Sequence, residues 1–279
     1  MMLSLFKCKP ISCHAAACLL AISLLTGCNQ EKAHPPSGSQ GAASFAVATA
    51  TAPIGSASSH SLSTNKKEGL TNMQVNGKLD ATGRVILQAG DISITVQTQH
   101  CIAETETLQQ CSNAIRLLIQ GTHLPEQNLE ISSLFFDSAA SFYRGPLNSH
   151  TATRKHSFIL SDVNNDGQED LLIWTGKEGA YGGASFDVYL ADPTTRKFQH
   201  SSAFSELTIG YNGLFIIDGN KIKTVASSGC CMHIFETYEI QNNTPVLIER
   251  ITEDSTNPAN PTQTKEILVD GKLQEIPVE

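Results

Sequence analysis

The chain has 279 residues, of which 27 are acidic and 19 are basic, and its formal net charge is −8 at pH 7. This balance argues against a nucleic-acid-binding protein, because affinity for nucleic acid comes largely from Lys and Arg set against phosphate. A hydrophobic content of 40% is enough for a packed core. Eight cysteines in a chain of this length are too few for a fold that disulfides alone hold together.

The N-terminus has the layout of a secretory signal peptide. Two lysines precede an apolar stretch at 15–25, the only such run in the sequence, and it is too short to span a bilayer as a stable helix. A polytopic membrane protein is therefore excluded. The stretch ends in Leu25-Thr26-Gly27-Cys28, which resembles the bacterial lipobox. The resemblance implies that residues 1–27 are a lipoprotein signal peptide and that Cys28 carries a lipid anchor; an ordinary signal peptide with a chance cysteine is the alternative.

The residues that follow Cys28 are predicted to be a tether. Asn29 is not the Asp that favours inner-membrane retention among lipoproteins, so the resemblance favours the outer membrane, with the domain in the periplasm. Residues 28–70 consist mostly of Ala, Ser, Thr, Gly and Pro and have no hydrophobic period. Such a segment cannot bury enough apolar surface to offset the entropy of ordering, so we expect it to be disordered.

Residues 71–279 are predicted to form an all-β domain of mainly antiparallel strands, either a β-sandwich or a barrel-like sheet. The expected strands include 85–87, 92–96, 115–119, 186–190, 214–217 and 222–225. Asn-Gly or Asp-Gly pairs at 76–77, 218–219 and 270–271 predict hairpin turns, because these residues tolerate positive φ angles. No repeat of a propeller's period is found. Gly145-Pro146 marks either a boundary between two subdomains or only a loop.

The most specific motif is a loop of nine residues rich in oxygen-bearing side chains. Loop positions 1, 3, 5 and 9 are occupied by Asp162, Asn164, Asp166 and Asp170. Gly167 at position 6 permits a sharp turn, and Gln168 at position 7 would offer its backbone carbonyl. Ca²⁺ requires six to eight oxygen ligands, which this pattern can supply, whereas Mg²⁺ demands stricter geometry. The loop is not a complete EF-hand, because position 12 is Ile173 rather than Glu.

This loop, followed by the apolar run 171–174, resembles the calcium loop of FG-GAP and VCBS-like β-repeats. The resemblance implies a structural Ca²⁺ ion that ties a loop to a strand; a loop of turn-forming residues without metal is the alternative. From about 140 to 255, the order of segments is similar to a family of bacterial periplasmic lipoproteins with a single FG-GAP-like loop. Some members of that family are immunity proteins that inhibit lysozyme-like toxins of type IV secretion. The resemblance therefore implies a protein-binding inhibitor or immunity factor.

An inhibitor of a muramidase needs a protrusion that enters a cleft lined by acids. The best candidate is the segment 177–183, whose glycines allow a projecting turn. Within it, Tyr181 is an aromatic anchor of the kind enriched at binding hot spots, and Glu178 lies on the same turn. The alternative is a glycine-rich hairpin whose Tyr packs on its own sheet. The segment 142–144 is a second candidate, with a strand end over the core as its alternative.

Four cysteines remain outside the signal peptide and the lipidation site: Cys101, Cys111, Cys230 and Cys231. We expect a disulfide between Cys101 and Cys111 that closes a short hairpin loop, and a vicinal disulfide between Cys230 and Cys231. Cross-pairing between the two sets is the alternative, because four cysteines allow three pairings. A thiolate–imidazole metal site that adds His233 lacks a fourth ligand at a recognisable spacing.

The sequence contains no motif of a serine hydrolase, a zinc protease or a phosphate-binding loop. We therefore expect no enzyme, with a cryptic hydrolase as a minor alternative. The predicted function is that of a lipid-anchored, calcium-binding periplasmic protein whose partner is a lysozyme-like enzyme or toxin. The rival is an envelope structural, adhesion or glycan-binding lipoprotein without inhibitory activity.

Overall fold

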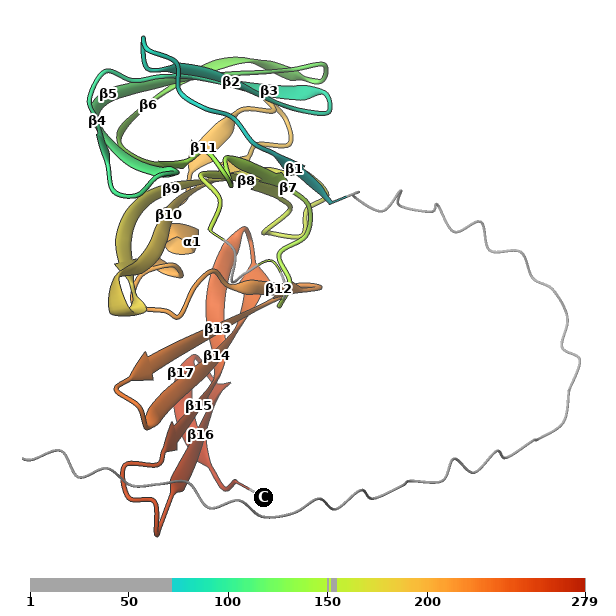
Figure 1. Cartoon of the computed structure of the whole chain (residues 1–279). Coiled ribbons are helices and arrows are strands. Elements are labelled where there is room, and N and C mark those ends of the chain that lie inside the picture. Colours follow the sequence, from blue (N-terminus) through green and yellow to red (C-terminus); the bar gives the residue numbers. More distant parts are fainter. Residues whose placement is uncertain (1–71, 150, 152–154, 279) are drawn as a thin grey trace, which may run out of the picture. The chain divides into compact units, whose positions relative to one another are not determined.

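The computed structural model describes residues 72–149, 151 and 155–278 (Figure 1). The predicted signal peptide, Cys28 and the predicted tether lie outside these residues. The prediction of an all-β fold with mainly antiparallel strands is confirmed: the described chain forms three sheets and one short α-helix. None of the helices in this part of the chain is long and apolar enough to cross a membrane.

The first two sheets are adjacent to each other. Sheet A has the strand order β1 (Met73–Val75), β7 (Phe142–Arg144), β8 (Phe158–Ser161), β9 (Asp170–Gly179), β10 (Gly183–Ala191) and β11 (Phe198–His200). Its pairs are antiparallel except β7 with β8, which are parallel. Sheet B has the order β2 (Arg84–Ala89), β3 (Ile92–Gln97), β5 (Leu108–Gly121) and β4 (Cys101–Ala103), with β6 (Leu124–Asp137) also paired to β5.

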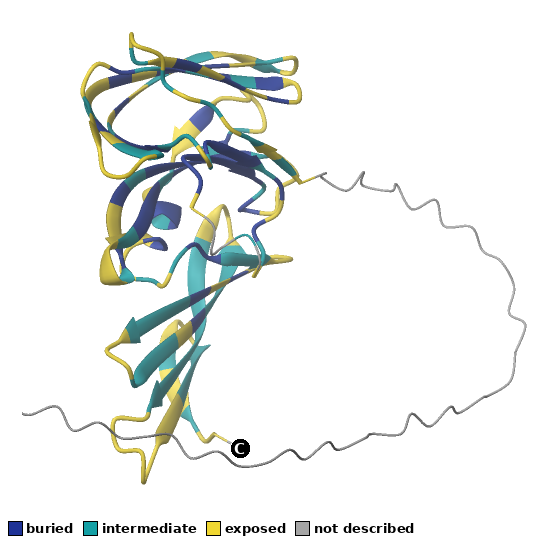
Figure 2. Cartoon of the chain, in the orientation of Figure 1, coloured by how far each residue is buried: buried dark blue, intermediate teal, exposed yellow. Residues whose placement is uncertain are grey.

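Sheet C is an antiparallel meander of the C-terminal strands. It runs in chain order through β12 (Ile216–Asp218), β13 (Lys221–Ser228), β14 (Met232–Gln241), β15 (Thr244–Asp254), β16 (Thr262–Val269) and β17 (Lys272–Ile276). Most of its residues are half-buried, in contrast to the buried centre of sheet A (Figure 2). All the described residues belong to one compact unit, in which Gly145 lies in the loop after β7 and donates its amide to the carbonyl of Leu160.

The centre of sheet A is buried on both faces, which explains the continuous apolar run in β9. Leu171 and Ile173 point into a core shared with sheet B. Leu172 and Trp174 point into a second core on the opposite face. Since side chains alternate along a strand, a strand buried on both faces reads as uninterrupted apolar sequence rather than as an alternating pattern.

The second core is covered by a segment that the sequence did not identify as helical. The short helix α1 (Ser202–Glu206) supplies Phe204 to this core, and the chain that follows supplies Leu207 and Phe215. Five residues are too few to show a helical period, which is why only strands were expected here. The strand expected at 214–217 begins at Ile216, because Leu214 and Phe215 belong to the connection that covers the core.

Two of the three predicted hairpin turns are confirmed. Gly219 turns the chain between β12 and β13, and Asp270 and Gly271, both with positive φ, turn it between β16 and β17. The prediction for Asn76-Gly77 is wrong, because β1 pairs with β7 and not with the next strand. Gly77 instead lies against Leu87, whose Cδ2 atom would be 2.5 Å from an added Cβ, so close packing explains this glycine.

Candidate functional site

The loop 162–170 connects β8 to β9, and its side-chain oxygens accept hydrogen bonds from its own backbone. Asp162 accepts from the amides of Asp166 and Gly167, each at 3.0 Å. Asp166 accepts from the amide of Gln168 at 2.8 Å. Gly167 has a φ of 89° with open space around its Cα, so the backbone angle explains the glycine here. The alternate oxygen-bearing residues are thereby held on a tightly turned backbone.

Asp170, the last residue of the predicted ligand set, is fully buried. Its Oδ2 atom accepts from the amide of Val163 at 2.9 Å and its Oδ1 atom from the amide of Ala191 at 2.8 Å. Burial, together with the smaller effect of the nearby charges of Asp166 and Asp162, raises the pKa of Asp170 to about 7, against the lowering effect of the two backbone hydrogen bonds. This carboxyl group therefore joins the loop to the end of β10.

The chemistry of this donor set fits a hard cation. A carboxylate has more lone pairs than the one or two that Asp162 and Asp166 use for backbone amides, and Ca²⁺ favours oxygen ligands. Asn164 adds an amide oxygen, and its nitrogen lies 2.9 Å from Oδ2 of Asp166 and 3.3 Å from Oδ1 of Asn243. Within the described residues, no group of three or more His, Cys, Asp or Glu side chains converges on a common point. The fit therefore rests on the type of donor and its spacing.

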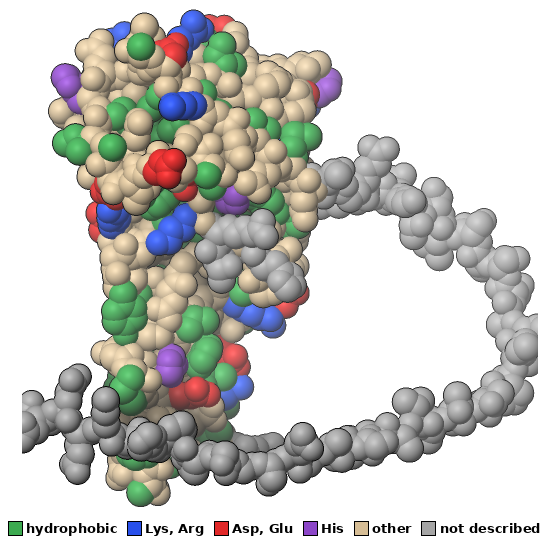
Figure 3. All heavy atoms as spheres, in the orientation of Figure 1, with side chains coloured by type: hydrophobic (Ala, Val, Ile, Leu, Met, Phe, Trp, Pro, Cys, Tyr) green, Lys and Arg blue, Asp and Glu red, His purple; other side chains and the backbone are tan. Residues whose placement is uncertain are grey.

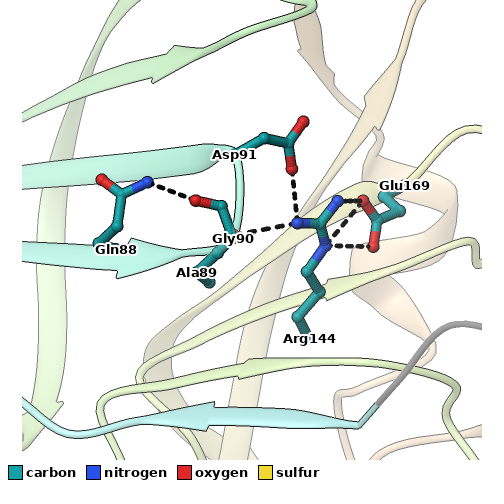
Figure 4. A network of polar contacts seen from close by, with 6 residues as sticks. All are labelled: Gln88, Ala89, Gly90, Asp91, Arg144 and Glu169. Carbon is teal, nitrogen blue, oxygen red and sulfur yellow. Dashed lines mark hydrogen bonds and ion pairs between the residues drawn. The ribbon is translucent and has the colours of Figure 1, made fainter.

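A half-buried arginine connects this loop to sheet B, as Figure 4 shows. Arg144 donates through Nε and Nη2 to both carboxylate oxygens of Glu169, at 2.6–3.0 Å. Its Nη1 donates to Asp91 at 2.7 Å and to the carbonyl of Ala89 at 2.9 Å. The hydrogen bond from Arg144 lowers the pKa of Asp91. No local sequence pattern predicts this network, because its members are far apart in the chain.

The same contacts decide between the two interpretations of 142–144. Tyr143 is buried, with 6% of its surface exposed, and its hydroxyl donates to the carbonyl of Pro146. Arg144 is committed to the ion pairs with Asp91 and Glu169. This segment is therefore a strand end over the core, as the alternative interpretation held, and does not present a free protrusion.

The glycine-rich segment 177–183 does project from the sheet. Tyr181 is 76% exposed and has a left-handed backbone with a φ of 55°, in a single 3₁₀ turn, η1 (Ala180–Gly182). Its hydroxyl donates to the carbonyl of Gly229 at 2.9 Å. Glu178 is also exposed, and its carboxylate accepts a hydrogen bond from the hydroxyl of Ser185. The predicted anchor is thus at the surface and does not pack flat on its own sheet.

Neighbouring loops brace this turn through the backbone. The amide of Ala180 donates to the carbonyl of Tyr211, and the amide of Gly210 donates to the carbonyl of Glu178, each at 2.8 Å. Gly179 allows β9 and β10 to approach closely, because an added Cβ would lie 2.9 Å from the backbone of Gly183. Two backbone bonds and a sterically required glycine thereby fix the position of the turn.

A groove lies at the base of this turn. It has a volume of about 640 Å³. Hydroxyl groups line much of it, from Ser132, Ser133, Thr175, Ser185, Ser205 and Thr208. Glu178 and Asp187 also line it, and Lys177 lies at its edge, with Nζ bonded to Glu104 and placed 5.0 Å from the ring centre of Phe135. Since Ser185, Ser205 and Thr208 are buried and already bonded within the protein, the remaining hydroxyl groups and the two carboxylates are what the groove offers to a polar ligand.

The structure joins Cys101 to Cys111 and Cys230 to Cys231, the pairing that we expected over cross-pairing. Cys101 and Cys111 are directly opposite each other on β4 and β5. Cys230 and Cys231 lie in the turn between β13 and β14, directly after Gly229. The metal site that would have used Cys230, Cys231 and His233 is not supported, since both cysteines are oxidised.

A second polar cluster escaped sequence analysis. The hydroxyls of Tyr211 and Tyr238 both donate to Oε2 of Glu236, at 2.6 and 2.7 Å. Arg250 donates to Oε1 of the same carboxylate at 2.8 Å. Burial and the neighbouring carboxylate raise the pKa of Tyr211. Glu236 was noted only as one of many acids, and no local signal predicts that two tyrosines and an arginine would surround it.

Charged side chains do not gather into one basic region on the face seen in Figure 3, where blue and red side chains are interspersed. The fold and the site together define a disulfide-bonded all-β domain with an acidic loop and a projecting tyrosine turn.

Comparison with solved structures identifies the family of this domain. The chain is 38% identical to a protein described as a Xanthomonas type IV secretion system related protein, with a TM-score of 0.72. The match covers 75% of this chain and all of that one. The chain therefore belongs to the same family as this Xanthomonas protein. No family model matches the chain, and no curated protein matches it.

Proposed function

We propose that this protein is a lipid-anchored, calcium-binding component of the bacterial cell envelope that binds and inhibits a lysozyme-like cell-wall hydrolase. Membership in the family of a type IV secretion system related protein supports an association with secretion and an envelope location. An immunity role against a secreted hydrolase is compatible with both. The function that we propose is binding rather than catalysis.

The observation that carries the proposal is the presentation of Tyr181. It is the most exposed aromatic side chain of the described residues, at 76%, and it stands on a turn that neighbouring loops brace by backbone hydrogen bonds. A rigid aromatic anchor loses little conformational entropy on binding and can enter a cleft. An acid-lined cleft of a muramidase would also offer carboxylate acceptors to the tyrosine hydroxyl, once it leaves Gly229.

A pull-down coupled to an activity assay tests the proposal. The full-length protein is used as bait, in calcium and in chelator, against periplasmic extracts and a panel of purified lysozyme-fold enzymes. The proposal expects a stoichiometric complex with at least one such enzyme and loss of its muramidase activity. Complex formation without loss of activity would contradict inhibition, and the absence of any complex across the panel would contradict the choice of partner.

We further propose that the loop 162–170 binds Ca²⁺ as a structural ion. The candidate ligands are the side chains of Asp162, Asn164, Asp166 and Asp170 with the carbonyl of Gln168. The ion would supply positive charge among three carboxylates of which one, Asp170, is fully buried. In that position it would stabilise the connection between β8 and β9, which also carries Glu169 of the arginine network.

We also propose that Cys28 is acylated and anchors the protein, with the outer membrane favoured. Stable anchoring requires more than one acyl chain, which a lipidated N-terminal cysteine supplies. This residue lies outside the described part of the chain, so the proposal rests on the lipobox-like sequence that precedes it.

The hydroxyl-lined groove favours a second candidate function, binding of an envelope glycan without inhibition. Sugars are recognised by hydrogen bonding, and the groove offers the hydroxyl groups of Ser132, Ser133 and Thr175 beside Glu178 and Asp187. Binding of soluble peptidoglycan fragments, measured by calorimetry, would distinguish the two. The glycan-binding function is favoured if the fragments bind saturably, if Asp187→Ala weakens this binding, and if the protein does not inhibit any muramidase of the panel.

A further inference from the structure

The two disulfides of this protein differ in exposure and in what they constrain. Cys111 is completely buried and Cys101 is half-buried, between two strands of sheet B. Cys230 is exposed and Cys231 is half-buried, at the tip of a hairpin. A thiol reagent in solution can therefore reach the second pair more easily, and access is one of the determinants of thiol–disulfide exchange.

The pair Cys230–Cys231 is also poorly suited to stabilise the whole fold. A disulfide stabilises a fold by lowering the entropy of the unfolded ensemble, and this effect grows with the length of the loop that it closes. The sequence separation is 10 for Cys101–Cys111 but 1 for Cys230–Cys231, which closes a ring that contains only the intervening peptide. Its constraint is therefore local, on the backbone of the turn between β13 and β14.

This turn has one anchor on each side of the vicinal disulfide. On one side, the carbonyl of Gly229, a residue with a φ of 69°, accepts the hydroxyl of Tyr181 at 2.9 Å. On the other side, the carbonyl of Cys231 accepts the amide of Ser255 at 2.7 Å. The disulfide therefore constrains the short backbone segment that lies between these two hydrogen-bonded carbonyls.

We propose that Cys230–Cys231 is a thiol–disulfide exchange site, and that its reduction by a protein dithiol releases Tyr181 from the carbonyl of Gly229. The contact links the redox state of one hairpin to the aromatic residue that projects from another. Any consequence of this release for partner binding rests on the proposed inhibitory function, whereas the exchange and the release do not.

The chemistry of the exchange is balanced by the dithiol. A donor thiolate attacks Sγ of the exposed Cys230, the bond to Cys231 breaks, and Cys231 leaves as a thiolate that takes up a proton. The second donor thiol then displaces Cys230 from the mixed disulfide, and Cys230 is protonated in turn. The cysteines gain two electrons and two protons, and the donor becomes a disulfide.

Selective reduction tests the site, with Cys101–Cys111 as the internal control. The full-length native protein is equilibrated with increasing dithiothreitol, quenched with acid and alkylated, and the modified cysteines are quantified by mass spectrometry. We expect half-maximal labelling of Cys230 and Cys231 at a dithiothreitol concentration about tenfold or more below that for Cys101 and Cys111. Simultaneous labelling of both pairs, or earlier labelling of Cys101 and Cys111, would overturn the proposal.

Hydrogen exchange tests the link to Tyr181. In the selectively reduced wild type and in Cys230→Ser/Cys231→Ser, we expect amide exchange of 177–183 to rise about twofold to tenfold, the equivalent of one lost hydrogen bond. Tyr181→Phe should show the faster exchange in the oxidised state and no further response to reduction. Unchanged exchange of 177–183 after reduction of the wild type would overturn the release of Tyr181. Neither readout involves a hydrolase, so failure of the inhibition assay leaves this test valid.

Discussion

Arg144 and Glu169 form a two-pronged ion pair, with side chains that are 19% and 17% exposed, between the end of β7 and the loop that precedes β9. Nη1 of the same arginine reaches Asp91 and the carbonyl of Ala89 in the turn between β2 and β3. One side chain thereby holds together sheet A, sheet B and the acidic loop. Arg144 and Glu169 are largely removed from water, so loss of the arginine leaves at least the Glu169 carboxylate half-buried without its counter-charge.

We expect Arg144→Ala to lower the free energy of unfolding by about 2–4 kcal/mol, measured by urea denaturation. The matched control is Arg116→Ala, which breaks the pair between Arg116 and Glu130, whose side chains are 72% and 71% exposed. The control substitution should lower the free energy of unfolding by less than about 1 kcal/mol, because exposed ion pairs contribute little to stability. Equal effects of the two substitutions would show that the buried network has no special role.

The pH dependence of stability should reveal Asp170. Its folded-state pKa of about 7 lies above the ordinary Asp pKa of about 3.9, so the folded state retains the proton over a range in which the unfolded state loses it. The contribution of this group is therefore fully present below about pH 4 and is lost as the pH rises toward 7, at up to about 1.4 kcal/mol per pH unit.

Urea denaturation in chelator at several pH values measures this slope. Asp170→Asn should flatten it, and the variant should be less stable than the wild type at low pH, because its amide group cannot accept from both Val163 and Ala191. If calcium binds beside Asp170, the wild-type slope should also be smaller in calcium than in chelator. A slope that Asp170→Asn does not change would assign the pH dependence to other groups.

Calcium binding is tested by Asp166→Asn against Asp80→Asn. Both carboxylates accept the amide two residues ahead at 2.8 Å, from Gln168 and from Thr82, so the two substitutions disturb a similar turn. Only the first removes a predicted calcium ligand. We expect calcium to raise the melting temperature of the wild type and of Asp80→Asn, but not that of Asp166→Asn. A calcium-dependent shift retained in Asp166→Asn would make the loop an ordinary turn.

The lipid anchor is tested by Cys28→Ala. Without the acylated cysteine, the protein should move from the membrane fraction to the soluble periplasmic fraction, as followed by immunoblot after fractionation. Cys18→Ala, within the predicted signal peptide, is the control and should leave the distribution unchanged. Membrane retention of Cys28→Ala would contradict the lipobox interpretation.

The sequence predicted the fold class and the features encoded by neighbouring residues. The alternating runs gave most strands, Asp270-Gly271 indicated a hairpin, and the loop from Asp162 to Asp170 was placed correctly before a buried strand. These signals are local, because period, turn angles and ligand spacing are all properties of short segments.

The features that were missed depend on residues distant in the chain. Arg144 meets Asp91 and Glu169 only after three elements have packed, and Glu236 meets Tyr211 across a similar separation. Asn76-Gly77 has the composition of a hairpin turn, but tertiary pairing of β1 with β7 overrides it. Likewise, the turn that presents Tyr181 is held by backbone hydrogen bonds to Gly210 and Tyr211, and no sequence pattern reveals these contacts.

Inhibition through Tyr181 is tested most directly by titrating a lysozyme-fold enzyme that this protein captures, with muramidase activity as the readout. Tyr181→Ala is compared with Ile102→Ala, because both side chains are 76% exposed and Ile102 lies on β4 of sheet B. We expect Tyr181→Ala to weaken inhibition by about 30-fold or more, as for a hot-spot residue worth about 2 kcal/mol, and Ile102→Ala to inhibit like the wild type. Full inhibition by Tyr181→Ala would contradict inhibition through Tyr181.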